Sequence, residues 1–84
     1  MDKKLTVIGS KNCLPCKVVR NFLKQYNIEH EYLDLTLPNH VERITHLISI
    51  SNQQRVPQLF VDDVFVSGDY HEIRNWIHAH MEDN

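Results

Sequence analysis

Residues 4–27 read KLTVIGSKNCLPCKVVRNFLKQYN, and the strongest structural signals of the chain lie in this segment. Lys4 to Ile8 is β-branched and apolar, which predicts a short buried strand that Gly9 ends. Apolar side chains then recur at helical spacing, which predicts a helix. These side chains are Val18, Val19, Phe22, Leu23 and Tyr26. Cys13 and Cys16 therefore lie where the predicted strand gives way to the predicted helix.

Three more strands are predicted further along the chain. Residues 29–35 form an imperfectly alternating apolar run, and residues 58–61 and 64–67 form two shorter runs. Asp62-Asp63 separates the last two runs and predicts only the tight turn of a hairpin.

Two more helices are predicted from their start signals. Pro38 suits a first helical turn, and Asn39 has the spacing from Glu42 that a capping box requires. Asp69 and Glu72, which follow the chain break at Gly68, have the same spacing. Apolar stripes follow both signals, and Ser49 to Gln54 is polar and predicts a loop between them. The stripes are Val41, Ile44, Leu47 and Ile48, and then Ile73, Trp76, Ile77 and His80.

The predicted order of elements is βαβαββα. A strand–helix–strand start implies a parallel pair with a right-handed crossover, and the hairpin adds an antiparallel pair. The fold class is therefore α/β, with a four-stranded mixed sheet flanked by three helices. A chain of 84 residues leaves little room for a second domain, so residues 1–84 are expected to form a single one.

Composition and charge argue against several classes of function. The formal charge is −2 and no basic run occurs, so nucleic acid is not an expected partner. No stretch approaches the roughly 20 apolar residues of a membrane span. The apolar run Leu5 to Gly9 is too short for a signal peptide, which makes the cytoplasm the expected location. In a reducing cytosol, two cysteines are more often catalytic or metal-binding than structural.

The Cys13-Leu14-Pro15-Cys16 motif carries the chemistry. The N-terminus of a helix presents unpaired N–H groups and a partial positive charge, and both stabilise a thiolate. Lys11 and Lys17 add positive charge nearby. Cysteines in such settings have pKa values of about 3.5–7.5, against about 8.5 ordinarily. We therefore predict that Cys13 is the nucleophile and that Cys16, one turn further in, is the resolving thiol.

Zinc binding is the main alternative for a C-x-x-C pair. A structural zinc site usually needs four ligands, and no second C-x-x-C follows. The histidines His71, His78 and His80 share one predicted helix, but their spacing does not present a ligand pair on one face. No metal site is expected, and Trp76 is expected to pack in the core.

Arg55-Val56-Pro57 opens the third predicted strand. Proline is tolerated at a strand start, which is one interpretation. A cis Val56–Pro57 bond facing Cys13 is the other. Lys11 and Arg55 are either solvated surface charges or groups that bind an anionic substrate.

These motifs together resemble the glutaredoxins of the thioredoxin-fold superfamily. The family signatures are C-P-Y-C, T-V-P-Q-hydrophobic-F, and G-G followed by an acidic pair. Residues 13–16, 55–62 and 66–69 match them in order and spacing. The resemblance implies that Pro57 is cis and borders the active site. It also implies that the backbone of Val56 pairs with the substrate peptide as an added strand.

The same resemblance implies a glutathione site. The amide of Asp69, after the position of the second glycine at Gly68, would bind the α-carboxylate of the γ-glutamyl group. Lys11 and Leu14 lie at or beside positions that also help to hold glutathione in that family. No bound cofactor is implied, and glutathione is the expected co-substrate.

The expected function is that of a monomeric dithiol oxidoreductase that reduces protein or glutathione mixed disulfides. The Ser67-Gly68 pair also resembles NrdH-type redoxins, which are recycled by a flavoprotein thioredoxin reductase and supply electrons to ribonucleotide reductase. Two further alternatives stay open. One is an iron–sulfur carrier that uses Cys13 from two subunits, and the other is a domain that only binds partners at its Pro57 edge.

Overall fold

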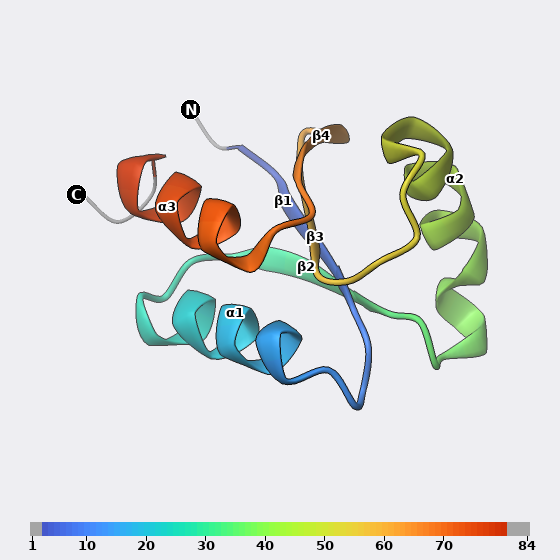
Figure 1. Ribbon diagram of the computed structural model, residues 1–84, viewed down its shortest axis with the longest axis horizontal. Coiled ribbons are helices and arrows are strands. Elements are labelled where there is room, and N and C mark those ends of the chain that lie inside the picture. Colours follow the sequence, from blue (N-terminus) through green and yellow to red (C-terminus); the bar gives the residue numbers. More distant parts are fainter. Residues whose placement is uncertain (1–2, 81–84) are drawn as a thin grey trace.

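A four-stranded mixed sheet lies between two layers of helices in the computed structural model, which describes residues 3–80 (Figure 1). The strand order is β2-β1-β3-β4. Helices α1 and α3 lie side by side on one face, and α2 covers the other face. The elements are β1 Leu5–Gly9, α1 Leu14–Gln25, β2 His30–Asp34, a 3₁₀ turn Pro38–His40, α2 Val41–Ser51, β3 Gln58–Val61, β4 Val64–Ser67 and α3 Tyr70–His80. The predicted α/β class, element order and mixed sheet are confirmed.

Strand β1 is the centre of the structure. It pairs in parallel with β2 and antiparallel with β3, and all five of its residues are buried. A strand with neighbours on both sides and helices on both faces is expected to be mostly apolar, and Leu5, Val7 and Ile8 satisfy this. Thr6 is the buried polar residue of β1, and its hydroxyl is hydrogen-bonded to Glu31. The loop that carries Cys13 leaves the sheet from the end of this strand.

Two separate hydrophobic cores hold the helices on the sheet. The first joins β1 and β3 to α1 and α3; its buried residues are Leu5, Val7, Val19, Leu23, Ile28, Leu59, Ile73 and Ile77. The second lies under α2; its buried residues are Ile8, Leu33, Ile44, Leu47 and Phe60. Each fully buried aliphatic side chain contributes about 1.5–3 kcal/mol. Trp76 is half-buried against the first core, as expected, and its ring stacks on that of His80 with centroids 4.2 Å apart.

The predicted end of the second helix is wrong. α2 continues through the polar residues to Ser51, and the Ser49 hydroxyl donates to the carbonyl of His46 within the helix at 2.6 Å. Asn52 then adopts a left-handed conformation with φ of 58° and caps the helix. The loop before β3 is therefore shorter than expected.

The predicted capping box at Asn39 is also wrong. Asn39 lies inside the 3₁₀ turn, and His40 occupies the N-cap of α2 without a side-chain capping bond. The imidazole Nδ1 of His40 instead accepts the backbone N–H of Asp34 at 2.9 Å. A contact to the end of β2 therefore replaces the local cap.

Gly9 belongs to β1 and does not end it. The ring of Tyr32, on the adjacent strand, occupies the space where a side chain of residue 9 would begin. The lack of a Cβ at Gly9 lets the two strands pair to the end of β1.

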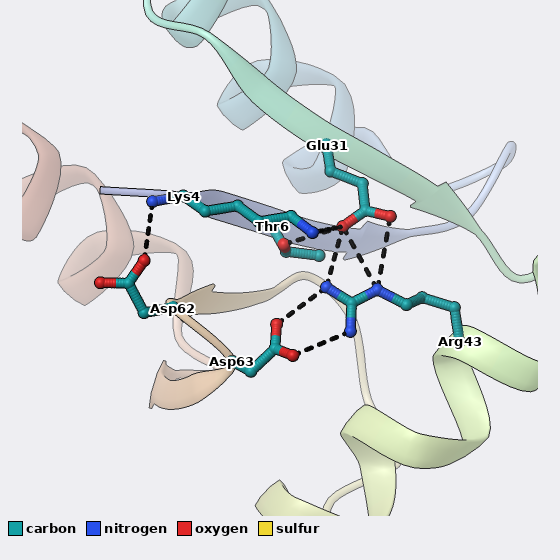
Figure 2. Close-up of polar contacts among 6 residues, drawn as sticks. All are labelled: Lys4, Thr6, Glu31, Arg43, Asp62 and Asp63. Carbon is teal, nitrogen blue, oxygen red and sulfur yellow. Dashed lines mark hydrogen bonds and ion pairs between the residues drawn. The ribbon is translucent and has the colours of Figure 1, made fainter. Parts of the chain in front are cut away.

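A charged network joins α2 both to β2 and to the β3–β4 turn (Figure 2). The guanidinium of Arg43 donates to Glu31 on β2 at 3.0 Å and to Asp63 in the β3–β4 turn at 2.8 Å. Thr6 donates its hydroxyl to the same Glu31 carboxylate at 3.0 Å. Bidentate contacts of this kind are stronger than ordinary surface ion pairs. The Asp62-Asp63 pair therefore does more than turn the chain.

The hairpin turn itself is as predicted. Asp62 and Asp63 both have positive φ, 51° and 64°, which suits the tight turns that join twisted strands. The Asp62 carboxylate also accepts the backbone N–H of Lys4 at 3.0 Å.

The network predicts a pH-dependent contribution to stability. Hydrogen bonds from Arg43 are the main reason why the pKa values of Glu31 and Asp63 lie below their ordinary values of 4.5 and 3.8. A lowered folded-state pKa gives stability that is complete above the unfolded pKa and is lost as the pH falls through the folded value. Arg43→Met should lower the free energy of unfolding by about 1 kcal/mol at pH 7, a figure that already discounts solvent screening.

Urea denaturation at pH 7 and at pH 3 measures this effect. The loss in free energy of unfolding caused by Arg43→Met should be smaller at pH 3 than at pH 7. The control Lys24→Met, at an exposed lysine of α1, should have the same free energy of unfolding as the wild type at both pH values. An equal deficit of Arg43→Met at both pH values would contradict the role of the carboxylates.

Candidate active site

Cys13 is the N-cap residue of α1. Its backbone is extended, with φ of −105° and ψ of 111°, and its Sγ accepts the backbone N–H of Cys16 at 3.2 Å. This is the position in which serine or aspartate usually caps a helix through an oxygen. A sulfur there receives both the N–H bond and the partial positive charge of the helix start, and both favour the thiolate.

Cys16 lies behind Cys13 and is fully buried, whereas Cys13 is partly exposed. The two residues form a disulfide, with their Cα atoms 5.2 Å apart. Pro15, between them, falls in the first helical turn, where its missing N–H costs the helix no hydrogen bond. The order of exposure makes Cys13 the sulfur that an incoming disulfide meets first.

The charges around the motif are positive. The first turn of α1 contains no acidic residue, and Lys11 and Lys17 are both exposed beside it. Lys11 also lies near Asp34, whose pKa is lowered chiefly by hydrogen bonds from Thr36 and to a smaller extent by the charge of Lys11. Leu14 is the most exposed large apolar side chain of the described residues, at 71%.

The Val56–Pro57 peptide bond is cis, as the resemblance implied. Val56 precedes β3, and no backbone hydrogen bond of its N–H or C=O occurs within residues 3–80. The edge of the chain at Val56 is therefore open to another backbone.

Gln58 fixes the shape of this loop. Its side chain is fully buried, and its Nε2 donates to the carbonyls of Gln53 at 2.9 Å and Arg55 at 2.8 Å. The Oε1 of Gln58 has no hydrogen-bond partner in the part of the chain that is described. Sequence reasoning treated Gln58 as an ordinary strand residue and missed this role. The available signal was a polar amide at the first position of an otherwise apolar strand.

Arg55 and Gly68 come together although they are far apart in the sequence. A Cβ at Gly68 would lie 2.8 Å from the Gln53 amide oxygen and 3.8 Å from Nε of Arg55. The 53–57 loop and the start of α3 thus form one continuous surface.

The amide of Asp69 is already hydrogen-bonded within the chain. It donates to the hydroxyl of Ser67 at 3.0 Å, and that hydroxyl donates to the carboxylate of Glu72 at 2.7 Å. The Asp69 carboxylate caps α3 by accepting the N–H groups of His71 and Glu72. The predicted capping box is therefore half correct. The Asp69 carboxylate caps the helix as expected, but Glu72 contacts the Asp69 amide only indirectly, through the hydroxyl of the buried Ser67. Sequence reasoning did not give Ser67 this role.

Residues 3–80 contain neither a metal-binding cluster nor a membrane-spanning helix. No group of three or more histidine, cysteine, aspartate or glutamate side chains within residues 3–80 is arranged to hold a metal ion. Over the same residues, no helix is both long enough and apolar enough to cross a bilayer.

The chain matches known proteins both in sequence and in fold. The glutaredoxin family model matches residues 5–66. A search of curated protein sequences finds no significant match. Among solved structures, glutaredoxin 1 from Francisella tularensis superposes with a TM-score of 0.65 and 15% identity, covering 93% of this chain and 95% of that one.

Two other solved structures are similar. The buckwheat glutaredoxin–glutathione complex has a TM-score of 0.70 and 17% identity, covering 95% of this chain and 72% of that one. The NrdH-redoxin from Escherichia coli, described as glutaredoxin-like with a thioredoxin-like activity profile, has a TM-score of 0.62 and 14% identity, covering 86% and 92%. At these identities the likeness concerns the fold alone.

The family match covers most of the chain, and it includes the helix-capping cysteine pair and the cis-proline loop. The chain therefore belongs to the glutaredoxin family and is a thiol–disulfide oxidoreductase with a thioredoxin-like fold.

Proposed function

We propose that this chain reduces disulfides of proteins, and mixed disulfides with glutathione, by a dithiol mechanism. Cys13 is the nucleophile and Cys16 is the resolving thiol. The observation that carries the proposal is the hydrogen bond from the Cys16 N–H to the Sγ of a partly exposed Cys13, with Cys16 itself buried. In the reduced protein, a sulfur in this position is accessible and is favoured as the thiolate.

The reaction proceeds by two exchanges. The Cys13 thiolate attacks one sulfur of the substrate disulfide, forms a mixed disulfide and releases the other sulfur as a thiolate, which takes up a proton. Deprotonated Cys16 then attacks the Sγ of Cys13. The second substrate thiolate leaves and the Cys13–Cys16 disulfide forms. Two electrons pass from the cysteine pair to the substrate.

The loop at Val56 orients the substrate in this proposal. A substrate backbone that pairs with the unpaired N–H and C=O of Val56 would lie as an added strand beside Pro57. Lys11 and Arg55 would contact anionic groups of the substrate, and the exposed Leu14 would contact its apolar groups. The buried Gln58 holds this loop in place through its hydrogen bonds to the carbonyls of Gln53 and Arg55.

Two substitutions test the roles of the cysteines. Cys13→Ser should abolish reduction of bis(2-hydroxyethyl) disulfide, because no nucleophile remains. Cys16→Ser should accumulate a mixed disulfide on Cys13, because nothing displaces the substrate; intact-mass spectrometry detects that adduct.

Alkylation of the reduced protein against pH should give a Cys13 pKa within about 3.5–7.5, below the ordinary value of about 8.5.

Reduced Cys13→Ser is the matched control for the alkylation, since it reports Cys16 alone. Retained disulfide reduction by Cys13→Ser would refute the assignment of the nucleophile. A Cys13 pKa near its ordinary value would refute activation by the helix start and favour a domain that only binds partners.

Glutathione is the electron donor that we propose first, because the chain belongs to the glutaredoxin family. A flavoprotein thioredoxin reductase is the second candidate, and one observation favours it. The Asp69 amide that would bind the glutathione carboxylate already donates to Ser67, and the carboxylate of Glu72 lies at the same hydroxyl. A second carboxylate would have to displace the hydroxyl beside an existing negative charge.

Ser67→Ala separates the two donors. Removal of the hydroxyl frees the Asp69 amide, and a charged hydrogen bond is worth about 1.5–3 kcal/mol, so glutathione-dependent kcat/KM should rise by at least about tenfold. Turnover with thioredoxin reductase and NADPH, measured in parallel, should be unchanged. An unchanged glutathione KM in the variant would show that Ser67 does not limit glutathione binding.

A further inference from the structure

A groove beside the cysteine pair is not used by the mechanism above. It runs between α1 and α3, which lie side by side on one face of the sheet (Figure 1), and its volume is about 270 Å³. Its apolar lining comes from Val18, Val19, Phe22, Tyr70 and Ile77. Small-molecule sites commonly measure about 300–1,000 Å³, so this groove suits one large side chain rather than a whole cofactor.

The groove begins one helical turn along α1 from the residue that follows Cys13. Leu14, next to the nucleophile, precedes Val18 by four residues, which places both on one side of the helix. Both are exposed, Leu14 at 71% and Val18 at 39%. The groove residues of α1 therefore begin about 6 Å along the helix axis from Leu14 and extend to about 17 Å at Gln25. An extended peptide covers that range in roughly two to five residues.

Positive charge frames the groove. Helix α1 contributes Lys17 and Lys24 and contains no acidic residue, and Arg74 of α3 lines the groove itself. Asn21 of α1 lines the groove. Lys17 lies one helical turn before Asn21 and Lys24 one turn after it, so both lysines lie near the α1 wall of the groove. The ion pairs of residues 3–80 join Lys4 and Arg43 to Glu31 and Asp63, and none includes Lys17, Lys24 or Arg74.

The acidic groups of α3 do not neutralise these cations. Asp69 is committed to the N–H groups at the helix start, and Glu72 is bound to Ser67. Glu72 is also two positions from Tyr70 and two positions from Arg74 in the sequence. At this spacing its side chain lies on another side of α3. The groove thus combines an apolar floor with unpaired positive charge on both walls.

We propose that this groove docks a segment of the protein substrate that carries a large apolar side chain and an acidic side chain two to five residues from the reacting cysteine. The apolar side chain enters between α1 and α3, and the acidic one lies against Arg74 with Lys17 or Lys24 opposite. The amides of Asn21 and Gln25 supply donors and acceptors for the peptide backbone. This inference rests on the proposed function, since it concerns the substrate of the same cysteine pair.

Single-turnover reduction of peptide mixed disulfides tests the proposal without an electron donor. Three peptides carry one cysteine, blocked by 2-mercaptoethanol, with flanking positions that contain Phe and Glu, Phe and Lys, or Ser only. Pre-reduced wild-type protein should react about three- to tenfold faster with the Phe–Glu peptide than with either of the others, a range typical of exposed charge pairs and one apolar contact. The preference over the Phe–Lys peptide should fall at 1 M salt, where screening acts within about 3 Å.

Charge reversal identifies the surface. Arg74→Glu should remove or invert the preference between the Phe–Glu and Phe–Lys peptides and leave the rate with bis(2-hydroxyethyl) disulfide unchanged. Arg20→Glu is the matched control, because it makes the same change of charge on α1 but its guanidinium lies over the ring of Tyr32, 4.3 Å from the centroid. Val18→Ser should weaken the preference for Phe over Ser.

The outcomes separate this proposal from the general function. Equal rates with all three peptides, or an equal effect of Arg74→Glu and Arg20→Glu, would overturn the docking groove while leaving the oxidoreductase intact. Failure of the wild type to reduce even bis(2-hydroxyethyl) disulfide would overturn the proposed function itself.

Discussion

The hydrogen bond from the Cys16 N–H to the Cys13 sulfur is the interaction on which the site depends. It requires a helix that begins immediately after Cys13, and that helix is held in place because Val19 and Leu23 are buried against the sheet. Cys16 is buried by the same packing. Hydrophobic burial of one helix face therefore places the outer sulfur at the helix start and shields the inner one from solvent.

Local periodicity was sufficient to predict the sheet and its three helices. The β1–α1 unit and the β3–β4 hairpin were predicted from residues adjacent in sequence, and their boundaries agree to within one or two residues. The end of α2 was not predicted, because the helix continues through polar residues to the left-handed cap at Asn52, a position that polarity alone does not indicate. The start of α2 was also missed, because His40 bonds to β2 rather than to its own helix.

The site was predictable only where its chemistry lies in adjacent residues. Cys13 and Cys16 are such a case, whereas the cis bond before Pro57 came from the family resemblance and not from the spacing. The bonds from Gln58 to Gln53 and Arg55 depend on the path of a loop. The chain of bonds from Asp69 through Ser67 to Glu72 depends on how β4 meets α3, so no pattern of residue types predicts it.

The separation of the two hydrophobic cores has a consequence for how such a chain can diverge. Cys13, Cys16 and both walls of the apolar groove belong to helices of one face, whereas α2 and the Arg43 network occupy the other. Substitutions beneath α2 alter the robustness of the scaffold at a distance from the reacting sulfurs. The groove proposed to select substrates and the Arg43 network thus lie on different sides of a single sheet, so an exposed groove residue such as Val18 can change without contact with that network.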